Sequence, residues 1–142
     1  ARAAELRIRP HGGDVVREVA WYPDGRRLAS SGGDGRVLVH DFAGEPRVAG
    51  REDVDVFTVQ VSADGRWLAY KTALGVVQLL DAERLSVQVI IHERTDDAWP
   101  RGLAFHPVLD RFAIRGAEGR GIRIWQIDQP ASSSVAAGDG AP

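Results

Sequence analysis

Residues 21–41, WYPDGRRLASSGGDGRVLVHD, contain the pattern that decides the fold. Two β-prone segments, 27–31 and 37–41, are framed by two turn sequences, YPDG at 22–25 and GGDG at 32–35. In such turns proline presets φ, aspartate suits the next position and glycine accepts a left-handed backbone. With the β-prone stretch 16–22 in front, the order is strand, turn, strand, turn, strand.

The same order returns twice further along the chain. DGR at 24–26 and LA at 28–29 recur at 64–66 and 68–69, a spacing of 40 residues. A looser third copy has LAFHP at 103–107 and IRIW at 122–125, which answer VAWYP at 19–23 and VLVH at 37–40. Further β-prone stretches lie between the copies at 5–9, 46–49 and 85–91. The prediction is an all-β chain of about three four-stranded antiparallel units, each of the length of a propeller blade.

These motifs resemble the WD-repeat (Trp-Asp repeat) β-propeller family. The first copy is the most specific: His11 stands at the place of the family's Gly-His dipeptide, and His40 stands in place of the signature tryptophan before Asp41. The resemblance covers roughly residues 5–128. It implies a propeller fragment over 1–128 with repeats at about 11–41, 54–81 and 92–128, joined by outer strands. The segment 129–142 is small, polar and turn-rich, and is predicted to be a flexible tail or linker.

In this family a buried hydrogen-bonded tetrad stabilises each blade. Carried over residue by residue, the first copy offers His11, Ser30, Asp34 and His40. Such a chain satisfies polar groups that would otherwise be buried without partners. The resemblance therefore implies a structural role for these four residues.

The second and third copies depart from the tetrad pattern. The second copy has Leu74 at the aspartate position and Leu80 at the tryptophan position, which predicts a packed apolar blade. The third copy has Trp125, with Glu118 near the aspartate position and His92 as a candidate histidine.

Three blades do not close a ring, because propellers need about four to eight. Residues 5–9 resemble an outermost strand without a blade before it, and 102–128 resemble a blade without its outermost strand. An incomplete ring exposes apolar blade faces of the kind found at interaction sites. Two interpretations stay open: a piece of a longer propeller, or a unit that other copies or partners complete.

A hydrolase triad of Ser30, His11 and Asp34 is the obvious catalytic alternative, but no G-x-S-x-G elbow is present. The glycine turns lack the following Lys-Ser/Thr of a phosphate loop, the four histidines are scattered, and there is no cysteine. The prediction is a protein that is not an enzyme and that binds neither cofactor nor metal.

A partner surface is predicted on the top face, where loops connect each outer strand to the next blade's inner strand. In WD-repeat proteins this face commonly carries the partner contacts, and aromatic and arginine side chains dominate interface energetics. The candidates are Arg17, Asp55, Phe57, Trp99 and Arg101. For Phe57 and Trp99 the alternative is packing between blades.

The predicted function is that of a non-catalytic scaffold for a protein or peptide partner, within a larger or oligomeric propeller. An alternative comes from SADGRWLAY at 62–70, which is similar to repeats of TolB-type propellers. It implies a sensor or gating domain of a larger enzyme or signalling protein.

Composition narrows the partners and the location. The formal net charge of the 142 residues is −2, which predicts neither a nucleic-acid nor a membrane partner. The absence of cysteine fits a reducing compartment, so a cytoplasmic location is predicted. Of 18 basic side chains only Lys71 is a lysine, which is typical of a GC-rich bacterial genome.

Overall fold

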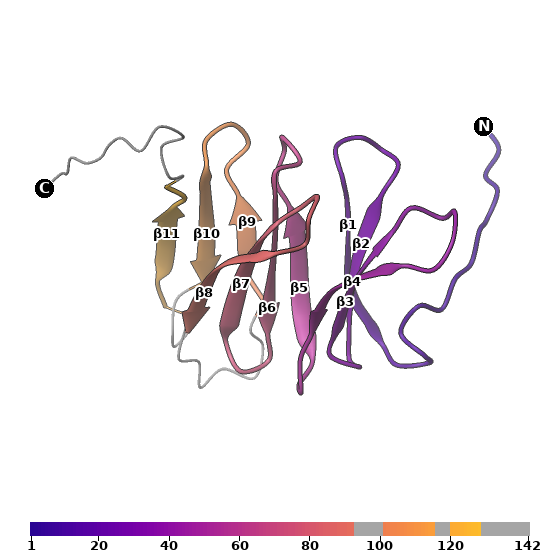
Figure 1. Cartoon of the computed structure of the whole chain (residues 1–142), viewed down its shortest axis with the longest axis horizontal. Helices are drawn as coiled ribbons and strands as arrows, with labels where there is room; N and C mark the ends of the chain where they lie inside the picture. Colours follow the sequence, from indigo (N-terminus) through magenta and orange to yellow (C-terminus); the bar gives the residue numbers. More distant parts are fainter. Residues whose placement is uncertain (93–100, 116–119, 129–142) are drawn as a thin grey trace, which may run out of the picture.

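The computed structural model describes residues 1–92, 101–115 and 120–128, and within these ranges every regular element is a β-strand. The strands form three antiparallel sheets that stand side by side in a row, each a blade (Figure 1). The all-β propeller fragment predicted from the repeats is confirmed. Blade 1 and blade 3 occupy opposite ends of the row, with blade 2 between them (Figure 1).

The strands follow the chain order within each blade. Blade 1 contains β1 (Val16–Trp21), β2 (Leu28–Gly32), β3 (Arg36–His40) and β4 (Arg47–Arg51); blade 2 contains β5 (Val56–Val61), β6 (Trp67–Thr72), β7 (Val76–Asp81) and β8 (Val87–His92); blade 3 contains β9 (Leu103–Phe105), β10 (Arg111–Arg115) and β11 (Ile122–Gln126). Blade 3 has three strands in the described residues.

The repeated DGR sequences build the same turn in blades 1 and 2. Gly25 and Gly65 have φ values of 69° and 75°, a conformation that glycine adopts without steric cost. The carboxylates of Asp24 and Asp64 accept hydrogen bonds from the N–H groups two residues later, at 2.8 and 3.0 Å. This local hydrogen bonding explains why the turn sequence is the best-preserved part of the repeat.

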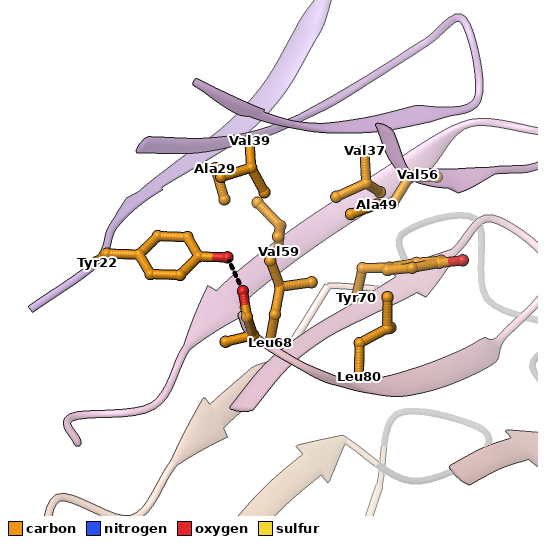
Figure 2. Close-up of a cluster of buried hydrophobic side chains, with 11 residues drawn as sticks. Tyr22, Ala29, Val37, Val39, Ala49, Val56, Val59, Leu68, Tyr70 and Leu80 are labelled. Carbon is orange, nitrogen blue, oxygen red and sulfur yellow. Dashed lines mark hydrogen bonds between the residues drawn. The ribbon is translucent and has the colours of Figure 1, made fainter. Parts of the chain in front are cut away.

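Alternation along the strands gives each blade two faces, and both faces of blade 2 are covered. Toward blade 1, Leu68, Tyr70 and Leu80 pack against Ala29 and Val39 (Figure 2). Toward blade 3, alternate residues of β6 and β7 join a second cluster that includes Phe112 and Ile114. The side chains of Trp67, Ala69, Val77 and Leu79 complete it from blade 2. The core is therefore two apolar layers, one at each junction between blades.

The prediction of a strand at residues 5–9 is wrong. This segment forms no strand, and Leu6 and Ile8 are exposed. A β-strand forms by pairing its N–H and C=O groups with a neighbouring edge, and none of the described edge strands, such as β4 and β11, pairs with this segment. The segment instead leads into the turn at 10–13, from which His11 enters blade 1.

Candidate functional site

A chain of hydrogen bonds joins the four residues predicted as a tetrad. His11 enters from the turn at 10–13, Ser30 lies on β2, Asp34 lies in the turn between β2 and β3, and His40 ends β3. The His11 Nδ1 atom is 2.8 Å from Asp34 Oδ1, and its Nε2 atom is 2.9 Å from Ser30 Oγ. Ser30 Oγ is in turn 2.9 Å from His40 Nε2. His11, Ser30 and His40 are all buried.

The donors and acceptors of this chain can be assigned in one consistent direction. Asp34 only accepts, so His11 donates from Nδ1 and its neutral Nε2 becomes an acceptor. Ser30 then donates its O–H to His11 and accepts an N–H from His40. Each of the three hydrogen bonds in this series then has one donor and one acceptor, which lowers the cost of burying these groups.

Gly32 makes room for this network. A Cβ built on Gly32 would lie 2.5 Å from His11 Nδ1 and 3.0 Å from Asp34 Oδ1. Atoms cannot approach this closely, so any side chain at position 32 displaces the imidazole. The glycine-rich turn therefore has two roles: it connects β2 to β3, and it leaves space for the His11 imidazole.

The protonation equilibria of the network are shifted in directions that keep the chain intact. Burial raises the pKa of the Asp34 carboxyl, but hydrogen bonds from the Arg36 N–H, from His11 and from the Arg36 guanidinium outweigh it, and the net shift is downward. Burial is the larger cause that lowers the pKa of His40, and the electrostatic effect of the neighbouring His11 imidazole is the smaller one. Asp34 therefore stays ionised and His40 stays neutral near pH 7.

The order Asp34, His11, Ser30 matches that of a hydrolase triad, but its surroundings differ. The hydroxyl of Ser30 is buried with only 2% of the residue exposed, and two imidazoles already occupy it. A nucleophile must reach the substrate carbonyl, and this oxygen faces the interior. The arrangement is suited to fastening the 10–13 turn to β2 and β3.

The other two blades carry no comparable network in the described residues. In blade 2, Leu80 is buried within the packed apolar blade that the sequence predicted, whereas Leu74, at the turn, is 68% exposed and does not contribute to that packing. In blade 3 the indole N–H of Trp125 is buried without a partner in the described part of the chain, and His92 is exposed at the end of β8. Glu118 lies outside the described residues.

Three of the predicted top-face residues contact one another. Arg17 forms an ion pair with Asp55, and its guanidinium lies 4.7 Å from the ring centre of Phe57, which is mostly buried. These contacts link β1 of blade 1 to blade 2. Arg101 is exposed, and Trp99 lies outside the described residues. The structure thus gathers Arg17, Asp55 and Phe57 into one group.

At the opposite end of the blades, the contacts between blades 1 and 2 were not predicted from the sequence. Arg27 makes two hydrogen bonds to the Glu83 carboxylate, at 2.7 and 2.8 Å, and these bonds lower the pKa of Glu83. Arg47 donates to the Glu83 carbonyl at 2.8 Å, and the Tyr22 hydroxyl donates to the Ala82 carbonyl at 2.8 Å (Figure 2). No repeat motif marks Glu83, so only the packing of blades identifies its partners.

The junction of blades 2 and 3 has its own polar contacts. The indole N–H of Trp67 donates to Asp110 Oδ1 at 3.2 Å, and the Arg66 guanidinium lies 3.4 Å from Asp110 Oδ2. Lys71 is buried here and donates to the Arg115 carbonyl at 3.3 Å. Each junction therefore combines an apolar layer with hydrogen bonds at its rim.

Both ends of the row present open blade faces. The leading face of blade 1, which points away from blade 2, carries Trp21 with 60% of its surface exposed, and beside it lies an open hollow of about 430 Å³. Phe42, His40, Leu6 and Ile8 contribute to the lining of this hollow. On the trailing face of blade 3, Ile122 and Ile124 are 77% and 70% exposed. Contiguous apolar exposure of this kind marks interaction surfaces.

Within the described ranges, no three His, Asp or Glu side chains gather closely enough to hold a metal ion. Over the same ranges there is no helix of the length and apolar character needed to span a bilayer.

Comparison with known proteins supports the resemblance noted in the sequence. Residues 5–41 match the WD40 family, described as "WD domain, G-beta repeat". No curated protein matches the chain significantly.

Two of the solved structures that match are "Crystal structure of RRP9 WD40 repeats" and "Structure of U3-55K", each with a TM-score of 0.71. Their sequence identities are 19% and 18%; each match covers 81% of this chain and 36% or 37% of the other. The chain therefore spans little more than a third of these structures, and at this identity they show the fold alone.

Proposed function

Since this chain is a partial WD-repeat β-propeller, we propose that it is a non-catalytic scaffold segment whose open ends are covered by further blades and whose top face binds a protein or peptide. The observation that carries the proposal is the apolar exposure at both ends of the row. Trp21 at one end and Ile122 and Ile124 at the other are exposed side chains of the kind that the internal junctions bury.

The need for further blades follows from the hydrophobic effect. Burying apolar surface stabilises by about 25 cal/mol per Å², so two uncovered blade faces strongly favour association. The covering blades belong either to a longer chain or to a partner subunit, as the sequence predicts.

The top face is proposed as the partner surface through Arg17, Asp55, Phe57, Trp99 and Arg101. Arg101 is exposed, and Arg17 and Asp55 are each partly accessible beside the covered ring of Phe57. An ion pair held over an aromatic ring is a rigid feature that a peptide can contact without ordering cost. The ring edge and the accessible charges together suit a polar peptide with an apolar anchor.

The burial of the Ser30-His11-Asp34 arrangement in blade 1 supports a non-catalytic role. The chain is also cysteine-free and weakly acidic, which supports a reducing, cytoplasmic setting and a protein partner in preference to nucleic acid.

The test is site-specific photo-crosslinking in the cells that make the protein. A photoreactive amino acid at Ile124 probes the open end, one at Arg101 probes the top face, and one at Gln88, on the exposed edge strand β8, is the control. We expect protein adducts from the first two positions and only background from the third. Equal labelling at all three positions would show that the two surfaces have no specific partner.

A further inference from the structure

The three blades can be superposed position by position through their strand registers. Ala29, Ala69 and Ala113 occupy the same place on the second strand of each blade, and their cross-strand partners are Val39, Leu79 and Ile124. Val39 and Leu79 are buried at the two internal junctions, whereas Ile124 is exposed. The same holds one pair further on: Val37 and Val77 are fully buried, and Ile122 is exposed. The trailing face of blade 3 thus has the composition of a junction that lacks its second half.

The polar contacts of the junctions follow the same positions. The residue before the second strand's Leu-Ala or Phe-Ala pair is Arg27 in blade 1, Trp67 in blade 2 and Arg111 in blade 3. Arg27 donates to Glu83 and Trp67 donates to Asp110, in each case a carboxylate of the following blade. At both internal junctions, this position therefore places an N–H donor against an acidic side chain.

Arg111 has no following blade among the described residues. Its Nε atom donates to Gln126 of its own blade at 2.6 Å, and the side chain is exposed. Since Arg27 and Trp67 each donate to a carboxylate of the following blade, a fourth blade stacked on blade 3 would be expected to place a carboxylate next to the Arg111 guanidinium.

The leading face of blade 1 does not supply that carboxylate at either of the two positions equivalent to Glu83 and Asp110. Ala43 is the blade 1 counterpart of Glu83. The N–H of Glu83 donates to Asp81 Oδ1 at 3.0 Å, and the N–H of Ala43 donates to Asp41 Oδ1 at the same distance. The counterpart of Asp110, the residue just before this donor position, is Arg26. A second copy stacked on blade 3 would therefore bring alanine and arginine to the places where the internal junctions have acids.

We propose that the trailing face of blade 3, formed by Ala104, Arg111, Ala113, Ile122 and Ile124, docks a further β-blade that carries an Asp or Glu opposite Arg111. A second copy of this chain lacks an acid at the equivalent positions and therefore binds this face more weakly. The inference rests on the proposed function, because it specifies the blade that completes the row. The alanine and isoleucine side chains supply the apolar contact area of this interface. The carboxylate determines which blade binds, because a blade without it would leave the Arg111 guanidinium unpaired at the edge of the interface.

The experiment turns the chain's own blade 1 into a matching partner. Ala43→Glu places a carboxylate at the Glu83 position, in an exposed turn where it leaves folding undisturbed. We expect head-to-tail association about tenfold tighter than that of the wild type in sedimentation equilibrium at low salt, weakening as salt is added. Arg111→Ala in the Ala43→Glu background should return the affinity to the wild-type value.

The isosteric control is Ala43→Gln, which has the same shape without the charge and should behave as the wild type. The proposal is overturned if Ala43→Glu sediments as the wild type does, if Ala43→Gln associates equally, or if Arg111→Ala leaves the new association unchanged. Circular dichroism verifies the fold of every variant. The cellular crosslinks from Ile124 and Arg101 are read separately, so a failure of charge selection is distinguishable from a failure of the scaffold function.

Discussion

Replacing Ser30 by alanine tests whether the buried hydrogen-bonded chain stabilises blade 1. The change removes the one oxygen that lies 2.9 Å from both His11 Nε2 and His40 Nε2. One buried acceptor and one buried donor then lose their partner, at about 1–3 kcal/mol each, partly relieved for His40 by the adjacent hollow. We expect Ser30→Ala to lower the free energy of unfolding by about 2–4 kcal/mol.

The neighbouring Ser31 is a matched control in the same strand. Its Oγ atom is fully buried and has no hydrogen-bond partner within the described part of the chain. Because Ser31→Ala removes an unsatisfied polar atom, it should be neutral or stabilising within about 0.5 kcal/mol. Urea unfolding followed by tryptophan fluorescence measures both variants, and Ser30→Ala should move the midpoint down by about 1–2 M. Equal stabilities of the two variants would refute the reasoning that the chain of hydrogen bonds fastens the blade.

Four further outcomes follow from the geometry. Gly32→Ala should cost about 1–3 kcal/mol because its Cβ meets His11, whereas Gly44→Ala, with open space around it, should be neutral in the same urea assay. Tyr22→Phe should lose about 1 kcal/mol with its 2.8 Å bond to Ala82, and Tyr70→Phe should lose less, since its hydroxyl lies 3.5 Å from Glu52. Because folding lowers the pKa of His40 from 6.5, the unfolded chain binds more protons, so the contribution of His40 to stability is complete above about pH 6.5 and is lost as the pH falls through the folded-state pKa. His40→Trp should be tolerated and should reduce this loss, which unfolding curves at pH 7 and pH 5 will measure. A fluorophosphonate probe should leave Ser30 unlabelled in the folded protein, and labelling that Ser30→Ala abolishes would contradict the fastening role.

The sequence predicted the elements whose causes are local. The turns at 22–25 and 32–35 form because proline, aspartate and glycine act on their own backbone, so a pattern of residue types suffices to find them. The same holds for the tetrad residues of blade 1, which the family resemblance placed at known positions within a single repeat. His11, Ser30, Asp34 and His40 are indeed within hydrogen-bonding distance along one chain.

The remainder depends on neighbours that a single repeat does not reveal. Glu83 pairs with Arg27 across 56 positions in the chain, and nothing in either local sequence specifies the other. The alternating pattern of residues 5–9 is compatible with a strand, but a strand forms only where another edge is available. Leu74 is an apolar residue close to the end of a strand, but it lies in a turn and its side chain is exposed to solvent.

The histidine at position 40 connects the internal network to the open end of the molecule. Its imidazole stacks on Phe42, with ring centres 6.1 Å apart, and Phe42 in turn lies 6.4 Å from the exposed Trp21. Two residues beyond the position of His40, blade 2 has Ala82 and blade 3 has Ile127, and both are buried against the preceding blade, whereas Phe42 at this place in blade 1 is 44% exposed. A blade that covered this face would remove water from Phe42 and from the outer edge of His40. Burial already lowers the pKa of His40, so a docked blade would lower this pKa further. Protonation of His40 would then destabilise the docked state more than it destabilises the isolated chain. A tryptophan at this position would supply the same N–H without a titratable group, so His40→Trp should remove this contribution to the pH dependence of stability.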